Sequence, residues 1–306
     1  MKKDVFRFFL YRINKEFRYD LFSSRDKLIG NHDSILHEYL SSVANSKFDV
    51  INETKKSIYS WAIRNHCILD NEFSSIVLAR SQILKEATIV TSDSLSQGET
   101  KSDPHPADTI VILFYWPRHL AIVENRSGMT TGETWLRYYH HIIDNAKITL
   151  DHPVVPRLEP IPLKGSIRDH LKKFDRIFRL RLKLSLPNPE INRAAKVIYD
   201  EMLESNISEY LQEFYSPEGV SVEEGTRIDQ SAAMAELGYK HGPIKIDGEK
   251  KGKPTTIDEG KTAIKGQIEQ LKSFIRGLET NAKGKNYQEG LCVLKEEVER
   301  LFPGED

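Results

Sequence analysis

The sequence predicts an α+β protein, and two patterns support this fold class. In residues 177–186, apolar side chains alternate with Arg, Lys and Ser, which is the period of a β-strand with one buried face. Residues 262–278 and 287–302 instead repeat apolar side chains every three or four positions, which is typical of amphipathic helices. The chain has 306 residues, which is enough for about two domains of roughly 150 residues each.

The first half of the chain is predicted to consist mainly of strands. An aromatic-rich run at residues 5–13 predicts the first strand, and apolar residues at helical spacing predict a helix over residues 33–44 with Asp33 as its N-cap. The polar, turn-rich stretch at residues 92–107 is expected to be an exposed loop. Further strands are expected over residues 57–67, 72–81, 87–91, 109–115 and 119–123.

A helix and a proline-rich connector follow these strands. Residues 130–133 have the sequence of a capping box and predict a helix to about Asn145. Residues 148–155 are expected to be extended, and four prolines between residues 153 and 162 are expected to form a stiff connector. We place the domain boundary there. This gives a β-rich N-terminal domain with an antiparallel sheet at residues 1–156 and a mixed α+β domain with a helical tail at residues 157–306.

The C-terminal domain is predicted to mix helices and strands. Residues 166–169 form a second capping box before a short helix, and Asn188 and Pro189 suit the cap and first position of a helix that ends at about residue 204. Residues 228–237 predict another helix, which ends at Gly238. A β-hairpin with a Gly- and Lys-rich tip is expected over residues 244–257.

The composition and charge of the chain argue against several classes of protein. The formal net charge is −1, which argues against a wholly basic nucleic-acid-binding protein, although a local basic patch is sufficient to attract DNA. Cys67 and Cys292 are far apart in sequence, which argues against a disulfide scaffold and a cysteine zinc site. Arg7 interrupts the N-terminal apolar run, and no stretch approaches the roughly 18 apolar residues of a membrane span. We therefore expect a cytoplasmic protein.

The alternating strand carries the main candidate binding surface. Arg179, Arg181 and Lys183 share one face at a spacing of about 6.6 Å, and such a row of cations suits the phosphates of nucleic acid. A half-exposed strand with solvated charges is the structural alternative. Further candidate nucleic-acid contacts lie upstream of this strand and in the predicted hairpin: Arg168, Lys172, Lys173, Arg176, Lys250, Lys251 and Lys253.

The hairpin tip resembles a phosphate-binding loop only in part. Gly248 and Gly252 are separated by three residues, whereas a Walker A loop needs four, and Pro254 stands where a Ser or Thr would bind magnesium. We therefore expect no nucleotide hydrolysis there. The tip is interpreted either as a basic finger that contacts nucleic acid or as a solvated turn.

Few residues suggest catalytic chemistry. His140 and Asp144 share a helix face at i and i+4, but no further ligands follow at metal-like spacing, so a packing role is expected. Asp108, Glu124 and Arg126 follow the order of a restriction-type nuclease core, with Arg126 where such a core has a lysine. We expect no catalytic residue, no metal and no cofactor.

The order of the predicted elements carries a resemblance to a known group of proteins. An aromatic strand ends at Tyr11 and Arg12, and a second motif, residues 120–124, precedes Thr130, Thr131 and a helix. A third motif, residues 158–162, then leads through a short helix to the basic strand. Over about residues 1–200 this layout resembles the RexA-type phage-exclusion proteins and, more broadly, phage-defence proteins such as the Kiwa B component.

The resemblance implies a cytosolic sensor or effector in antiviral defence. It also implies a homodimer that binds double-stranded DNA with little sequence preference and acts with a membrane-protein partner. Two alternatives stay open. One is a divergent metal-dependent nuclease that uses Asp108, Glu124 and a distant lysine. The other is a protein-interaction module whose acidic segment, residues 201–224, docks a basic partner.

Overall fold

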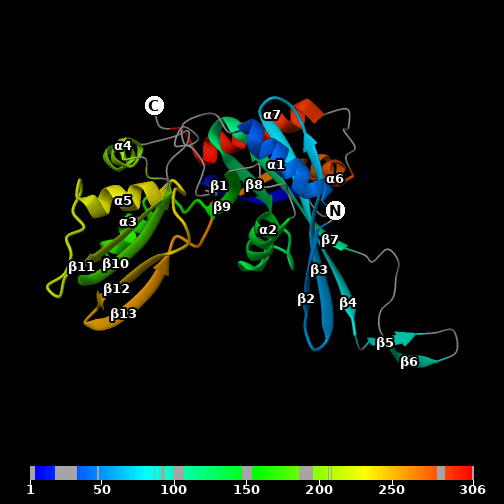
Figure 1. The fold of residues 1–306 in the computed structure, drawn as a ribbon, viewed down its shortest axis with the longest axis horizontal. Helices are drawn as coiled ribbons and strands as arrows, with labels where there is room; N and C mark the ends of the chain where they lie inside the picture. The colour runs from blue at the N-terminus through cyan, green and yellow to red at the C-terminus, as the bar shows by residue number, and fades with distance from the viewer. Residues whose placement is uncertain are drawn as a thin grey trace, which may run out of the picture.

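Antiparallel sheets with helices packed on them make the α+β fold that the sequence predicts (Figure 1). The computed structural model describes residues 4–17, 33–46, 48–85, 87–90, 94–98, 107–146, 154–185, 196–205, 207, 209–280 and 287–304. Within these ranges, no helix combines the length and the apolar character needed to cross a membrane.

The larger sheet is built around β1 (Val5–Phe17). One edge of β1 pairs with β8, while the other edge pairs with β14 along its first half and with β9 along its second half. The sheet continues from β8 through β7, β4, β3 and β2. These strands span Asp49–Glu53 (β2), Ser57–Ile68 (β3), Phe73–Leu84 (β4), Ala107–Tyr115 (β7), Leu120–Glu124 (β8), Val154–Pro160 (β9) and Lys265–Glu269 (β14).

Helices cover both faces of this sheet, so its central strands are buried on both sides. On one face, α1 (Asp33–Asn45) and α2 (Thr134–Asn145) pack on Tyr11 and Ile13 of β1. On the other, α6 (Lys272–Glu279) and α7 (Tyr287–Leu301) belong to the core that contains Phe6, Phe8 and Leu10. Alternate residues of β1 therefore serve two different cores.

A second, four-stranded sheet lies beside the first and is covered on one face (Figure 1). Its strands, in spatial order, are β11 (Glu209–Tyr215), β10 (Arg176–Ser185), β12 (Ile244–Lys250) and β13 (Lys253–Glu259). Its core includes residues of α3 (Ser166–Leu171), α4 (Lys196–Glu204) and α5 (Arg227–Glu236). A separate two-stranded sheet contains β5 (Ala87–Val90) and β6 (Leu95–Gly98), and a 3₁₀ turn, Trp116–Arg118, joins β7 to β8.

The alternation of β10 is confirmed, with one change at its start. Leu180, Leu182 and Leu184 are buried, but Ile177 rather than Phe178 joins them in the core. The register with β12 shifts between Ile177 and Arg179, and such a bulge moves one residue to the opposite face.

The single helix expected over residues 262–278 is wrong, because its first part is β14. Apolar residues at 264 and 268 fit a strand as well as a helix, and β1 offers a free edge for hydrogen bonding. Gly266 permits this pairing: a Cβ atom there would lie 2.2 Å from Cζ of Phe8. Only the second part of the segment forms a helix, α6.

The two predicted capping boxes do not form. Helix α2 begins at Thr134 without a side-chain cap, because Thr130 Oγ1 instead accepts a hydrogen bond from the Arg126 amide at 2.9 Å. Helix α3 follows Gly165, which has a φ of 77°, and also lacks a side-chain cap. The positions of both helices agree with the prediction even though their caps do not.

Strand pairing does not follow the division expected at residue 156. That position lies inside β9, where Pro156 and Pro160 are tolerated because β9 is an edge strand. The proline-rich stretch is therefore part of the larger sheet, and β14, α6 and α7 return to that sheet from the end of the chain. Asn188, Pro189 and most of the loop expected over residues 92–107 lie outside the described residues, and residues 95–98 of that stretch form β6 rather than a loop.

Candidate functional site

Six of the ten predicted nucleic-acid contacts come together at one end of the second sheet. A two-residue turn, Lys251 and Gly252, joins β12 to β13, and both residues have the positive φ of a tight hairpin turn. The Gly252 amide donates to Asp175 Oδ2 at 3.1 Å, which holds the turn against the segment between α3 and β10. We call the resulting group the hairpin-end cluster: Lys172, Lys173, Arg176, Lys250, Lys251 and Lys253.

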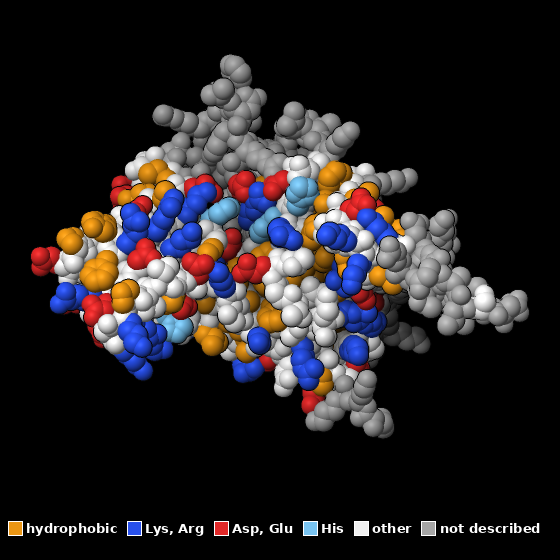
Figure 2. All heavy atoms as spheres, turned by 90° about the horizontal axis from the view of Figure 1, so that it is seen from below, with side chains coloured by type: hydrophobic (Ala, Val, Ile, Leu, Met, Phe, Trp, Pro, Cys, Tyr) orange, Lys and Arg blue, Asp and Glu red, His pale blue; other side chains and the backbone are white. Residues whose placement is uncertain are grey.

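The hairpin-end cluster has an excess of positive charge at the surface. Five of its six cations are exposed, and Lys250 lies partly over Phe174, with Nζ 5.8 Å from the ring centroid. The neighbouring carboxylates belong to Asp169, one helical turn before Lys172, to Asp175 and Glu249, and to Glu218 in an adjacent turn. The six cations therefore outnumber these four carboxylates. Figure 2 shows how Lys, Arg, Asp and Glu side chains intermingle over much of one face of the molecule.

The other cations of β10 lie on a face whose charge is balanced. Arg179 Nε lies 2.8 Å from Glu213 Oε1, and Lys183 Nζ lies 2.6 Å from Glu209 Oε2. Apart from Arg176 and its partner Glu249, which are counted with the hairpin-end cluster, strand register places four cations and four carboxylates on this open face: Arg179, Arg181, Lys183 and Lys245 with Glu209, Glu213, Asp247 and Asp258. The row of cations in the sequence therefore does not become a basic surface.

Arg168, the remaining predicted contact, stabilises the fold of the second sheet. Its guanidinium lies 2.9 Å from Glu236 Oε2, and the same carboxylate accepts the amides of Gly165 and Arg168. Glu236 is buried, so its charge depends on these partners.

The residues of the nuclease alternative are not arranged as a metal site. Asp108 pairs with Arg80 at 2.7 Å, and Glu124 accepts the Val111 amide and pairs with Arg276 at 2.5 Å. Within the described part of the chain, no group of three or more His, Cys, Asp or Glu side chains could hold a metal ion. The acidic segment of the second alternative is also engaged internally, since Glu201 pairs with Arg227.

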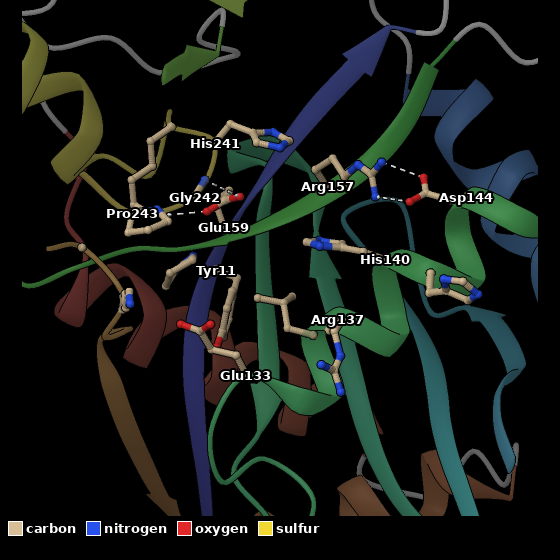
Figure 3. A pocket seen from close by; sticks show the side chains of 16 residues that line it. Tyr11, Glu133, Arg137, His140, Asp144, Arg157, Glu159, His241, Gly242 and Pro243 are labelled. Carbon is tan, nitrogen blue, oxygen red and sulfur yellow. Dashed lines mark hydrogen bonds and ion pairs between the residues drawn. The ribbon is translucent and has the colours of Figure 1, made fainter. Parts of the chain in front are cut away.

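A cavity of about 600 Å³ lies between the two sheets, and we call it the junction cavity (Figure 3). Its walls come from β1, α2, β9, the loop that follows α5 and the segment that follows β13. Figure 3 shows Tyr11, His140, Glu159 and His241 directed toward a common space from these different elements.

Two polar residues of β1 hold the loop after α5 in place. Arg12 is fully buried and donates from Nε to the Leu237 carbonyl at 2.8 Å. Asn14 Nδ2 donates to the carbonyls of Gly238 and Lys240, both at 3.0 Å. Gly238 has a φ of 85°, and a Cβ atom there would lie 2.6 Å from Arg12 Cβ, so only glycine fits.

A buried ion pair forms one wall of the junction cavity. Lys240 Nζ lies 3.2 Å from Glu159 Oε2, and the Gly242 amide donates to Glu159 Oε1 at 3.1 Å. Lys240 is only 1% exposed, and burial lowers its pKa while Glu159 opposes that shift. The pair joins β9 of the larger sheet to the loop that leads into β12.

His140 is held as a neutral ring on another wall. Its Nε2 accepts the Leu158 amide at 3.2 Å, so its proton resides on Nδ1. Burial, together with the nearby Arg157 and His241, lowers its pKa to about 3. Arg157 is itself fixed by Glu16 and by Asp144, whose Oδ1 lies 2.6 Å away. His140 and Asp144 thus do not form the acid–base pair that their spacing permits.

The junction cavity offers binding groups rather than an activated nucleophile. Lys240 and Arg157 are paired with carboxylates, and burial with neighbouring carboxylates raises the pKa of Tyr11, whose hydroxyl therefore stays protonated. Sequence reasoning missed this site because its residues are scattered over several segments of the chain. The usable signal was Arg12 and Asn14, two polar residues that continue the alternation of the buried Phe6, Phe8 and Leu10 along β1.

The comparisons with known proteins identify a family. Residues 84–273 match the family described as "Domain of unknown function (DUF4747)". The match covers more than half of the chain, and the protein therefore belongs to this family. It includes the second sheet and every cavity-lining residue named above except those of β1. No curated protein matches the chain.

Proposed function

We propose that this protein binds double-stranded DNA, with little sequence preference, through the hairpin-end cluster. The observation that carries the proposal is the hydrogen bond from the Gly252 amide to Asp175, which joins two separate basic segments into one surface. Contacts to phosphates need cations and amides but no base recognition, which fits a surface made mainly of lysines.

The open face of β10 is a weaker candidate for DNA binding, because two of its cations are paired with carboxylates. A phosphate that approaches Arg179 or Lys183 also approaches Glu213 and Glu209. DNA would have to displace these carboxylates, whereas Lys172 and Lys251 have no ion pair among the described residues. The hairpin-end cluster therefore supports phosphate contact at a lower cost.

A gel-shift titration of duplex DNA over a range of salt concentrations tests this proposal. For DNA-binding proteins, each phosphate contact contributes about −0.9 to the slope of log K against log salt. The double variant Lys172→Gln/Lys251→Gln should weaken binding and reduce that slope by about 2. The matched control, Lys55→Gln/Lys56→Gln, removes two exposed charges from the turn between β2 and β3 and should bind as the unchanged protein does.

Two results would contradict the proposal. Equal loss in both variants would mean that only the overall charge matters, and no shift at low salt would exclude DNA as a ligand. Cleavage that requires magnesium would favour the nuclease alternative instead.

The resemblance to phage-exclusion proteins supplies the biological setting of this proposal. In that setting the protein acts in the cytoplasm as a sensor or effector of antiviral defence, as a homodimer and with a membrane-protein partner. These statements rest on the order of elements in the sequence, and they stay predictions.

The junction cavity supports a second candidate function, the binding of a small polar ligand. Ligand sites are typically cavities of about 300–1,000 Å³ with a few fixed polar groups, and residues with shifted pKa values gather at them. The fixed His140 ring and the buried Lys240–Glu159 pair have these properties. A bound ligand would touch both sheets at once.

A further inference from the structure

A second cavity, of about 380 Å³, lies near the first residues of β1 and is rich in cations. It opens between the start of β1, the end of β8 and the start of α6, and we call it the β1-start cavity. Four cations line it, with one carboxylate, Glu124, among them: Arg7, Arg126, Lys272 and Arg276. Glu124 and Arg126, two residues of the nuclease-like motif, thus line a cavity rich in cations rather than a metal site.

Carboxylates hold two of these guanidinium groups in fixed positions. Arg276 pairs with Glu124 at 2.5 Å and also with Glu279. Arg126 lies 3.3 Å from the same Glu279 oxygen and donates to the Thr109 carbonyl at 2.6 Å. Both groups are therefore ordered before any ligand arrives, and this reduces the entropy lost when a ligand binds.

Glu124 is not available as a competing anion in the cavity. It is only 5% exposed, and its two oxygens accept hydrogen bonds from the Val111 amide and from Arg276. Glu279 is likewise engaged, by Arg126, Arg276 and Thr109. Together these two carboxylates balance the charges of Arg126 and Arg276.

The other two cations of the cavity have no carboxylate within the described ranges that neutralises their charge. The side chains of Arg7 and Lys272 are exposed, and neither side chain makes a hydrogen bond or ion pair with a described residue. They belong to different elements, β1 and α6, but line the same cavity. A structural ion network would need only the four balanced groups, so these two extra cations point to an anionic ligand.

We propose that the β1-start cavity binds a small phosphorylated ligand. Guanidinium groups match the geometry of phosphate oxygens, and lysine adds a point charge. The volume lies at the low end of the range for small-molecule sites, which suits a free phosphate or a phosphorylated sugar and is small for a larger ligand. This site is separate from the hairpin-end cluster and shares no residue with it.

Thermal unfolding in the presence of inorganic phosphate and, separately, ribose 5-phosphate tests the proposal. A ligand that binds the folded state raises the unfolding midpoint as its concentration increases. We expect a rise with at least one of the two probes, relative to sodium chloride at equal ionic strength. The variant Arg7→Gln/Lys272→Gln should need at least tenfold more of that probe for the same rise, while Lys55→Gln/Lys56→Gln should respond as the unchanged protein does.

The two probes and a DNA gel shift separate the possible outcomes. A rise with ribose 5-phosphate alone would support a phosphate monoester as the ligand, and a rise with both would support the phosphate group itself. No rise beyond that in sodium chloride, or an equal rise in both variants, would overturn the proposal. Loss of DNA binding in Arg7→Gln/Lys272→Gln would also overturn it, because the cavity would then serve DNA.

Discussion

The buried pair of Lys240 and Glu159 allows a prediction of how single and double substitutions change the free energy of unfolding. Lys240→Met leaves a buried carboxylate with one amide partner, and removing one member of a buried pair typically costs about 3–5 kcal/mol of unfolding free energy. Glu159→Gln/Lys240→Met, which removes both charges, should cost less than the sum of its single changes. Urea denaturation of the three variants measures this. Strictly additive losses would show that the two groups are not coupled.

His140 predicts a loss of stability on acidification. Its pKa is about 3 in the folded protein, against about 6.5 in an unfolded chain. Between these values the unfolded state binds more protons, so the free energy of unfolding falls as pH decreases from about 6.5 toward 3. His66, whose pKa burial lowers to about 4, adds a loss of the same sign.

A pair of neighbouring substitutions isolates the contribution of His140. His140→Gln keeps an acceptor for the Leu158 amide but cannot titrate, so its stability should fall less steeply below pH 6.5. His141→Gln, at the exposed neighbouring position, should keep the slope of the unchanged protein. Urea midpoints measured between pH 7.5 and pH 5 compare the variants. Equal slopes for all three proteins would argue against the half-buried His140 ring as the cause.

At the scale of elements, β11 determines what the basic strand can do. Because Glu209 and Glu213 neutralise Lys183 and Arg179, Glu209→Gln/Glu213→Gln should leave two cations of β10 unpaired. If the protein binds DNA, this variant should bind more tightly and with a steeper salt dependence. Glu289→Gln/Glu296→Gln makes the same change of charge on α7 and should have a smaller effect. Gel shifts at two salt concentrations measure both, and weaker binding by the β11 variant would contradict the role given to these carboxylates.

Helices and strands whose own side chains determine their structure are predictable from the sequence, whereas those that depend on a distant partner are not. The strands around residues 5–13, 57–67 and 109–115 were predicted because their own side chains set the period. Strand β14 was missed because its pattern also fits a helix, and the choice depends on a free edge of β1 and on contact with Phe8, about 260 residues earlier. The charge balance of β10 was missed for a similar reason, since pairing with β11 is not visible in β10 itself.

At the scale of the whole molecule, the chain leaves and re-enters the larger sheet at one point. The Ile161 amide donates to the Leu10 carbonyl, the Leu10 amide donates to the Ile264 carbonyl, and the Ile264 amide donates to the Ile161 carbonyl at 2.8 Å. The second sheet is therefore an insertion between β9 and β14. Its loop rests on Arg12 and Asn14, which links the inserted part to the sheet that carries it.

This topology predicts that residues 1–156 do not fold alone. The fragment lacks β14, α6 and α7, so Phe6, Phe8 and Leu10 would expose their apolar surface to water, at a cost of about 25 cal/mol per Å². We expect a fragment that aggregates or unfolds without a cooperative transition. Replacement of residues 163–262 by a short Gly-Ser linker should instead keep a cooperative transition, because this protein retains both cores of the larger sheet. It should be less stable than the full chain, because Arg12 and Asn14 lose the carbonyl groups that accept their hydrogen bonds. Urea unfolding followed by circular dichroism compares the two proteins, and a cooperative transition in the 1–156 fragment would show that the expected boundary separates independent domains after all.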